Sequence, residues 1–242
     1  MKTVSPFFLT LALFIGAVLP ARASETVEIP QEELARESVL PRFDRPDNVK
    51  NRNVVTSHKV EFGVYYGLNF TEPIYNQSKI GFNAGYHLSE DSAIMVNFAQ
   101  WMSGRNSLYV PNIQAQAPQT DYSRVPDLKD SIWVHYEVTA YYGKISLTKN
   151  GVMNTTLYPI FGAGATQYTN KVYPGIDVGV GQKFYFTKTI ALRIDFKFQY
   201  QQSPNPFVGS ALQVSQPAPS SGAFSDQWTL GNILDAGVSF LF

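Results

Sequence analysis

The sequence contains no cysteine, has few charged residues and carries no surplus of either charge. The absence of cysteine excludes disulfide bonds, thiol catalysis and metal sites built on thiolates. Charged residues make up 16% of the 242 residues, whereas ordinary soluble domains contain about 25%. A formal net charge of zero argues against a nucleic-acid partner, because phosphate binding requires a basic surplus. The length permits one large all-β domain.

The first 23 residues have the features of a secretory signal peptide. Lys2 provides a positive start, residues 7–19 form an apolar stretch, and Ala21 and Ala23 provide a small-x-small cleavage site. The alternative is an uncleaved anchor helix, but such a helix requires about 18 or more consecutive apolar residues. We therefore expect cleavage after Ala23 and export of the mature chain.

Residues 24–56 form a polar extension, whereas residues 57–242 form a body with little charge. The extension holds 12 charged residues in 33, with a short helix expected over 31–39. Such a composition cannot bury a hydrophobic core. The body holds only 24 charged residues in 186. The sequence therefore predicts two regions after the signal peptide: a periplasmic extension (24–56) and a folded domain (57–242).

The body alternates apolar and polar residues with a period of two, which is typical of β-strands with one apolar face. Loops between the expected strands alternate between tight turns, such as 89–91 and 187–189, and long segments, such as 103–129 and 201–225. The expected strands cover 59–70, 79–88, 94–98, 132–142, 155–168, 176–186, 190–200 and 228–242. An even number of strands, with short turns at one end and long loops at the other, is typical of transmembrane β-barrels.

A soluble barrel has the same period with its faces reversed. Three features favour an apolar face that contacts lipid: the low charge, strands of 10–16 residues where about 9–11 cross a bilayer, and aromatic residues at both strand ends. We expect Phe70, Tyr200 and Trp228 at the long-loop interface. The aromatics expected at the other interface are Tyr86, Tyr142, Phe184, Phe186, Phe240 and Phe242. The predicted fold class is all-β, an eight-stranded antiparallel transmembrane barrel.

The C-terminal residues form a second pattern. Asp235, Gly237, Phe240 and Phe242 are spaced as in the terminal insertion signal of Gram-negative outer-membrane barrels. The body also resembles a largely uncharacterised family of outer-membrane β-barrel domain proteins, through segments 142–147, 157–164, 179–184 and 191–193. This resemblance implies the fold and an outer-membrane location, and it brings no catalytic residues. In such a barrel we expect both termini to lie in the periplasm.

The polar faces of the expected strands point into the lumen. Together they supply equal numbers of basic and acidic residues: Lys59, Lys79, Lys183, Arg193 and Lys197, with Glu61, Glu137, Asp177, Asp195 and Asp235. An eight-stranded barrel leaves an interior just wide enough for side chains, and buried charges persist only when they are paired. We therefore expect a polar, side-chain-filled lumen, with a narrow solute path as the alternative.

An enzyme requires a nucleophile, a base and an orienting group within reach of one another. His135 and Glu137 share an inward face and could serve a lipid hydrolase or acyltransferase, but membership of the polar lumen also explains His135. We expect no enzyme, no metal and no cofactor. The expected partners are outer-membrane lipid and the outer-membrane assembly machinery, with further copies of this chain as a third candidate. The predicted role is structural or interactive at the cell surface, with porin-like passage of small solutes as the alternative.

Overall fold

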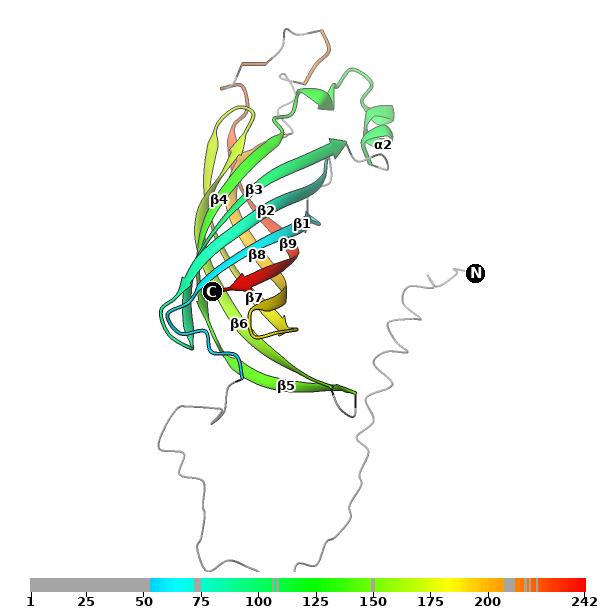
Figure 1. The fold of residues 1–242 in the computed structure, drawn as a ribbon. Helices are drawn as coiled ribbons and strands as arrows, with labels where there is room; N and C mark the ends of the chain where they lie inside the picture. Colours follow the sequence, from blue (N-terminus) through cyan, green and yellow to red (C-terminus); the bar gives the residue numbers. More distant parts are fainter. Residues whose placement is uncertain are drawn as a thin grey trace, which may run out of the picture. The chain divides into compact units, whose positions relative to one another are not determined.

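In a computed structural model of the chain, antiparallel strands form a closed barrel (Figure 1). The structure describes residues 53–71, 75–105, 107, 109–148, 151–206, 212–215, 217, 219–220 and 222–242. The expected signal peptide and most of the extension, including its helix over 31–39, lie outside these residues. The strands are β1 Val60–Asn69, β2 Tyr75–His87, β3 Ser92–Arg105, β4 Leu128–Val138, β5 Tyr141–Thr148, β6 Gly151–Tyr168, β7 Val172–Tyr185, β8 Ile190–Pro204 and β9 Asp226–Leu241.

The sheet order is β4-β3-β2-β1-β9-β8-β7-β6-β5, and an additional pairing of β4 with β6 closes the cylinder. Eight strands therefore form the barrel, and β5 is an extra strand that pairs with the first part of β6. The prediction of an eight-stranded antiparallel barrel is confirmed. Figure 1 shows β5 and the start of β6 extending beyond the barrel at the end opposite α2.

The expected continuous strand over 132–142 is wrong, because β4 ends at Val138 and β5 begins at Tyr141. Tyr141 lies four residues after Glu137, whereas their partners on β6, Leu157 and Ile160, lie three residues apart. One extra residue on one side of a ladder is a bulge, and it moves every later side chain to the opposite face. Tyr142 is consequently buried inside and is not an interface aromatic.

Side chains on the barrel are distributed in the reverse of a soluble protein. Valine, isoleucine and phenylalanine cover the outside, where Val64 is 60% exposed and Ile176 is 57% exposed. The interior contains buried charges such as Glu61 and Lys183, which are 2% and 3% exposed. Only a surrounding lipid phase makes an apolar exterior of this kind favourable. The fold is therefore a transmembrane barrel, as predicted.

Aromatic residues mark both rims of the apolar surface. Near the long loops, Tyr200 and Trp228 are half-exposed and stack with ring centroids 4.9 Å apart. Near the short turns, Phe62 and Phe242 meet edge to face, with centroids 6.3 Å apart. Aromatic rings of this kind prefer the membrane–water interface.

The long loops are not purely irregular. The segment between β3 and β4 contains the helix α2 (Tyr109–Gln116) and the 3-10 helix η2 (Tyr122–Arg124). This segment meets the loop before β9: the amide of Asp121 donates to the carbonyl of Leu212 at 2.7 Å, and Thr120 pairs with Gln213. The loops share an apolar cluster formed by Tyr75, Val110, Tyr122, Val125, Leu212 and Phe224. They therefore pack into one unit at this end of the barrel.

Candidate functional site

The structure brings together nine of the ten residues expected to line the lumen. Alternation along each strand places these side chains inward, where all nine are buried. The carboxylates are Glu61, Glu137, Asp177, Asp195 and Asp235, and the cations are Lys79, Lys183, Arg193 and Lys197. We call this set the charged core.

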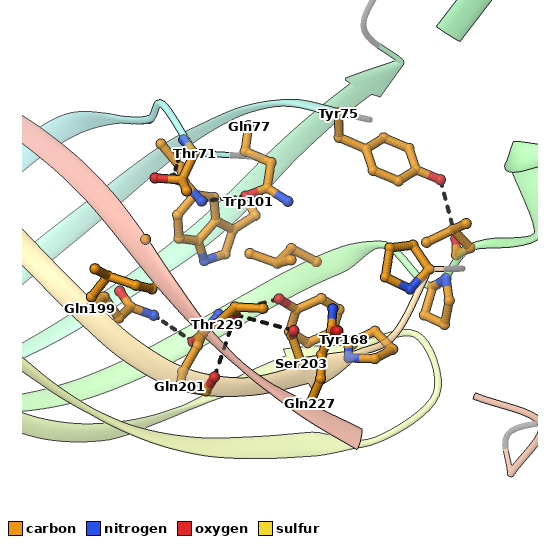
Figure 2. Close-up of a pocket in the computed structure, with 18 of the residues that line it drawn as sticks. Thr71, Tyr75, Gln77, Trp101, Tyr168, Gln199, Gln201, Ser203, Gln227 and Thr229 are labelled. Atoms are coloured by element: carbon orange, nitrogen blue, oxygen red, sulfur yellow. Dashed lines mark hydrogen bonds between the residues drawn. The ribbon is translucent and has the colours of Figure 1, made fainter. Parts of the chain in front are cut away.

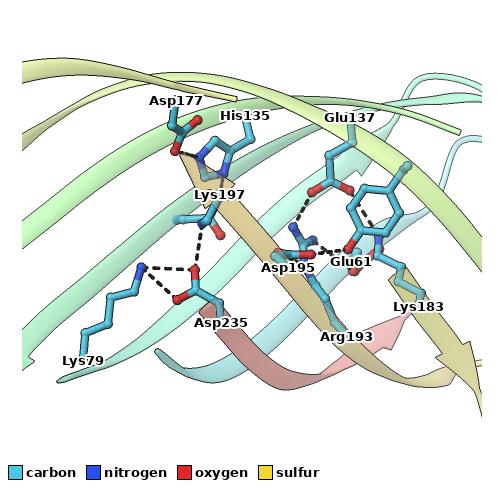
Figure 3. Close-up of polar contacts among 12 residues, drawn as sticks. Glu61, Lys79, His135, Glu137, Asp177, Lys183, Arg193, Asp195, Lys197 and Asp235 are labelled. Atoms are coloured by element: carbon cyan, nitrogen blue, oxygen red, sulfur yellow. Dashed lines mark hydrogen bonds and ion pairs between the residues drawn. The ribbon is translucent and has the colours of Figure 1, made fainter. Parts of the chain in front are cut away.

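Arg193 on β8 is the centre of the charged core (Figure 3). Its guanidinium donates to Glu137 at 2.5 Å and to Asp195 at 2.7 Å. Lys183 on β7 bridges the same region, because its ammonium lies 2.7 Å from Glu61 and 3.3 Å from Glu137. Charged side chains from four strands, β1, β4, β7 and β8, are thereby linked in one network.

Asp235 on β9 organises a second group of charges nearer the long loops. Lys197 approaches its carboxylate to 2.7 Å and Lys79 approaches it to 3.0 Å. The ammonium of Lys79 also lies 5.3 Å from the ring centre of Tyr65 and 5.2 Å from that of Trp101. Cation–π contacts of this kind add stabilisation where water is scarce.

A glycine makes room for this group. Gly67 on β1 lies between Lys79 on β2 and Asp235 on β9 in the ladder. A Cβ atom at position 67 would collide with the Asp235 carboxylate and the Lys79 side chain. Glycine is therefore required here by the close approach of two charged side chains inside a narrow barrel.

Two histidines complete the interior. His135 lies 2.9 Å from Asp177 and 2.6 Å from the amide of Asn97, so it is a member of the polar lumen and is not paired with Glu137 as the alternative catalytic interpretation would require. His87 bonds to Glu61 at 2.8 Å and is buried. His87 is the last residue of β2, and its inward phase on that strand places its ring in the lumen beside Glu61.

Lys59 is the exception among the ten. It lies one residue before β1, is only half-buried, and forms no ion pair with any residue in the described part of the chain. Lys59 lies in the turn before β1, and its backbone carbonyl accepts a hydrogen bond from the amide of His87. The sequence pattern instead predicts Lys59 within the strand, with its side chain pointing inward. The extension contributes a different residue to this end of the barrel: Val54, which is buried against Tyr142, Tyr185 and Leu241.

A cavity of about 250 Å³ lies between the charged core and the long loops (Figure 2). Its lining contains amides, hydroxyls and aromatic rings, and none of the lining residues is charged. Figure 2 shows Gln77 and Trp101 on one side, with Gln199, Gln201 and Thr229 on the other. We call this cavity the neutral vestibule, and no prediction from the sequence identified it.

At the loop rim, Lys171 and Asp226 form an exposed ion pair with nitrogen and oxygen 2.6 Å apart. The hydrogen bond from this pair raises the pKa of Lys171 above its ordinary value. Exposed pairs of this kind add little to stability. In the described residues we find no group of histidine and acidic side chains arranged to hold a metal. The same residues contain no helix that is both long and apolar enough to span a membrane.

The closed strand order, the apolar exterior and the charged interior define an eight-stranded transmembrane β-barrel. No family profile and no curated protein matches the chain. Among solved structures it is similar to the N-terminal β-barrel domain of Pseudomonas aeruginosa OprF, at 10% identity and a TM-score of 0.42, covering 77% of this chain and 98% of that one.

Two further structures are similar at the same level. Neisserial surface protein A shares 11% identity and a TM-score of 0.38, with coverage of 76% of this chain and 96% of that one. A de novo designed transmembrane β-barrel shares 12% identity and a TM-score of 0.37, with coverage of 77% and 97%. We assign the chain to the transmembrane β-barrels from its own strand order and its apolar outer surface.

Proposed function

We propose that the protein is an integral outer-membrane β-barrel with a structural or surface-interaction role, and that its lumen is closed. The charged core carries this proposal. Five carboxylates and four cations from strands all around the barrel meet in the interior, and their bonds cross it. Side chains that pair across a narrow lumen leave no continuous space for water.

The cavities around the charged core support a closed lumen. One beside Arg193 and Asp235 has a volume of about 10 Å³, and one between His87 and Tyr185 has about 20 Å³. Room for a single water requires about 10–15 Å³ on this measure. Isolated waters fit in such spaces, but a hydrated ion does not.

The test is the conductance of the purified barrel in a planar bilayer. We expect no steady conductance from the wild-type protein. We expect Arg193→Ala to cause intermittent currents, because it opens space at the centre of the network. A stable open channel in the wild-type monomer would contradict the closed lumen.

Porin-like passage is the second candidate, and the neutral vestibule favours it, because a cavity of about 250 Å³ already lies at the loop end of the lumen. Passage would then require the charged core to rearrange. Liposome swelling with sugars of increasing size would separate the two roles, since a closed barrel gives no swelling with any of them.

We propose a non-catalytic role. His135 is 1% exposed and bonds to Asn97 and Asp177, while Glu137 is held by Arg193 and Lys183. Neither group can reach a lipid without breaking the charged core. Lipid composition in a strain lacking the protein, compared with its parent, would reveal a lipid-modifying activity.

Outer-membrane localisation is supported by the exterior and by the C-terminal residues. Phe240 and Phe242 are exposed on the outside of β9 and its end, where an assembly factor can contact them. Gly237 lies against Tyr65 in the ladder between β1 and β9. We expect replacement of both phenylalanines by serine to leave the protein in the periplasm, which fractionation would detect.

A further inference from the structure

We propose that the neutral vestibule binds a small uncharged saccharide. The inference goes beyond the structural role proposed above and does not depend on whether the lumen is closed. It starts from the chemistry of the lining, which combines an apolar wall with a row of uncharged polar groups and excludes charged residues.

The apolar wall includes two buried aromatic rings and two buried aliphatic side chains. Trp101, Leu128, Tyr168 and Ile233 are all buried and belong to one packed cluster. The indole nitrogen of Trp101 donates to Ser131 at 3.0 Å, which fixes the ring in place. Fixed aromatic rings provide a flat apolar surface without an entropic penalty on binding. The carbon–hydrogen face of a pyranose is complementary to such a surface.

The polar wall is held rigid by its own hydrogen bonds. The Gln201 amide oxygen accepts from Thr166 at 2.9 Å and from Gln199 at 2.5 Å, and its nitrogen donates to Tyr168 at 3.2 Å. Ser203 accepts from the hydroxyl of Thr229 at 3.2 Å. These side chains are therefore pre-organised, and a ligand need not order them.

Two amide groups in this cavity have unused hydrogen-bonding capacity. The side-chain oxygen of Gln77 accepts from Asn69 at 2.7 Å, but its nitrogen has no partner among the described residues. The side-chain oxygen of Gln199 likewise has no partner among them. Both side chains are more than nine-tenths buried, at 5% and 4% exposure. Both residues line the cavity, and a ligand hydroxyl can accept from the Gln77 nitrogen and donate to the Gln199 oxygen.

The absence of charge in the lining selects the class of ligand. A carboxylate, phosphate or ammonium group would lose its hydration without gaining an opposite charge, which is strongly unfavourable. A purely apolar ligand would leave Gln77 and Gln199 unsatisfied. A neutral polyol with one apolar face fits both walls, and the volume of about 250 Å³ restricts it to about one sugar ring.

The test uses the full-length protein in detergent and saturation-transfer NMR with glucose, galactose and N-acetylglucosamine, with glucuronate as the charged comparison. We expect at least one neutral sugar to bind and glucuronate not to bind. Gln77→Leu and Gln199→Leu should each weaken binding at least tenfold. Gln100→Leu, on the exposed outer face of β3, is the matched control and should bind as the wild type does.

The proposal is overturned if none of the three neutral sugars binds, if glucuronate binds equally well, or if both inner glutamine variants retain wild-type affinity. Retention of the heat-modifiable gel shift identifies the variants that still fold, and the two variants provide independent tests. Comparison of each sugar with its methyl glycoside distinguishes a free sugar from the terminal residue of a glycan, because only a site for a glycan end accepts an alkyl group at the anomeric oxygen.

Discussion

The inward face of β8 changes character halfway along the strand. Arg193, Asp195 and Lys197 belong to the charged core, whereas Gln199 and Gln201 line the neutral vestibule. Both groups have the same alternation, the same neighbouring strands and nearly the same burial. The difference is one of charge alone, and it divides the interior into a part that is closed by ion pairs and a part that remains open.

This division follows from what each kind of group requires. A buried charge must contact an opposite charge, so charged side chains extend across the lumen and fill it. A buried amide or hydroxyl can instead bond to a neighbour along the wall, as the side-chain nitrogen of Gln199 does to the side-chain oxygen of Gln201 on the same strand. Neutral groups can therefore remain along the wall and leave a cavity between them. Trp101 lies at the boundary, with Lys79 on one side and the vestibule on the other.

The largest expected effect comes from breaking the charged core. Arg193→Ala removes the partner of Glu137 and Asp195 and leaves two carboxylates buried without it. Loss of one partner from a buried ion pair typically costs about 3–5 kcal/mol. We expect a loss of that size in the free energy of unfolding, measured by urea titration in lipid vesicles with the heat-modifiable gel shift as the signal.

Lys188→Ala is the control for this change, because Lys188 lies exposed in the turn between β7 and β8. It should unfold at the wild-type urea concentration. If Arg193→Ala matched it, the charged core would contribute no more than surface charge, and the contrast with the vestibule would disappear.

The contrast can be sharpened by placing a charge on the outer surface. Val64→Arg puts a guanidinium on the outward face of β1, where lipid replaces water. A lipid-facing arginine near the bilayer midplane costs about 2–4 kcal/mol. Val214→Arg is the control: Val214 is similarly exposed, at 58% against 60% for Val64, but lies in a long loop. Equal unfolding free energies for the two variants would show that β1 does not face lipid.

Much of this arrangement could be predicted from the sequence, because alternation is a local property. On β8, the apolar residues Ile194, Phe196 and Phe198 alternate with polar ones, and this pattern determines which side of the strand faces lipid. The charged residues on the other face follow directly. The same inward face continues as Gln199, Gln201 and Ser203, but the sequence pattern indicates a loop over 201–225, so it does not predict the neutral part of the lumen.

The remaining features depend on contacts between distant segments. The bulge before β5 reverses the faces at Tyr142, and only the pairing with β6 reveals the extra residue. Lys59 continues the alternation of β1 but precedes the strand. The packing of the loop around Tyr122 against the loop around Leu212 joins residues about ninety positions apart. No local pattern specifies any of these contacts.

The smallest expected effect comes from breaking a hydrogen bond in the neutral vestibule. Thr166→Val removes the hydroxyl that donates to Gln201 and preserves the shape of a side chain that is fully buried. Gln201 still accepts from Gln199, so no buried acceptor loses its last donor. A neutral hydrogen bond contributes about 0.5–1.5 kcal/mol, and we expect a loss of about 1 kcal/mol in the urea titration. A loss as large as that of Arg193→Ala would mean that the vestibule is held together as tightly as the charged core, and the division of the interior by charge would then not explain its stability.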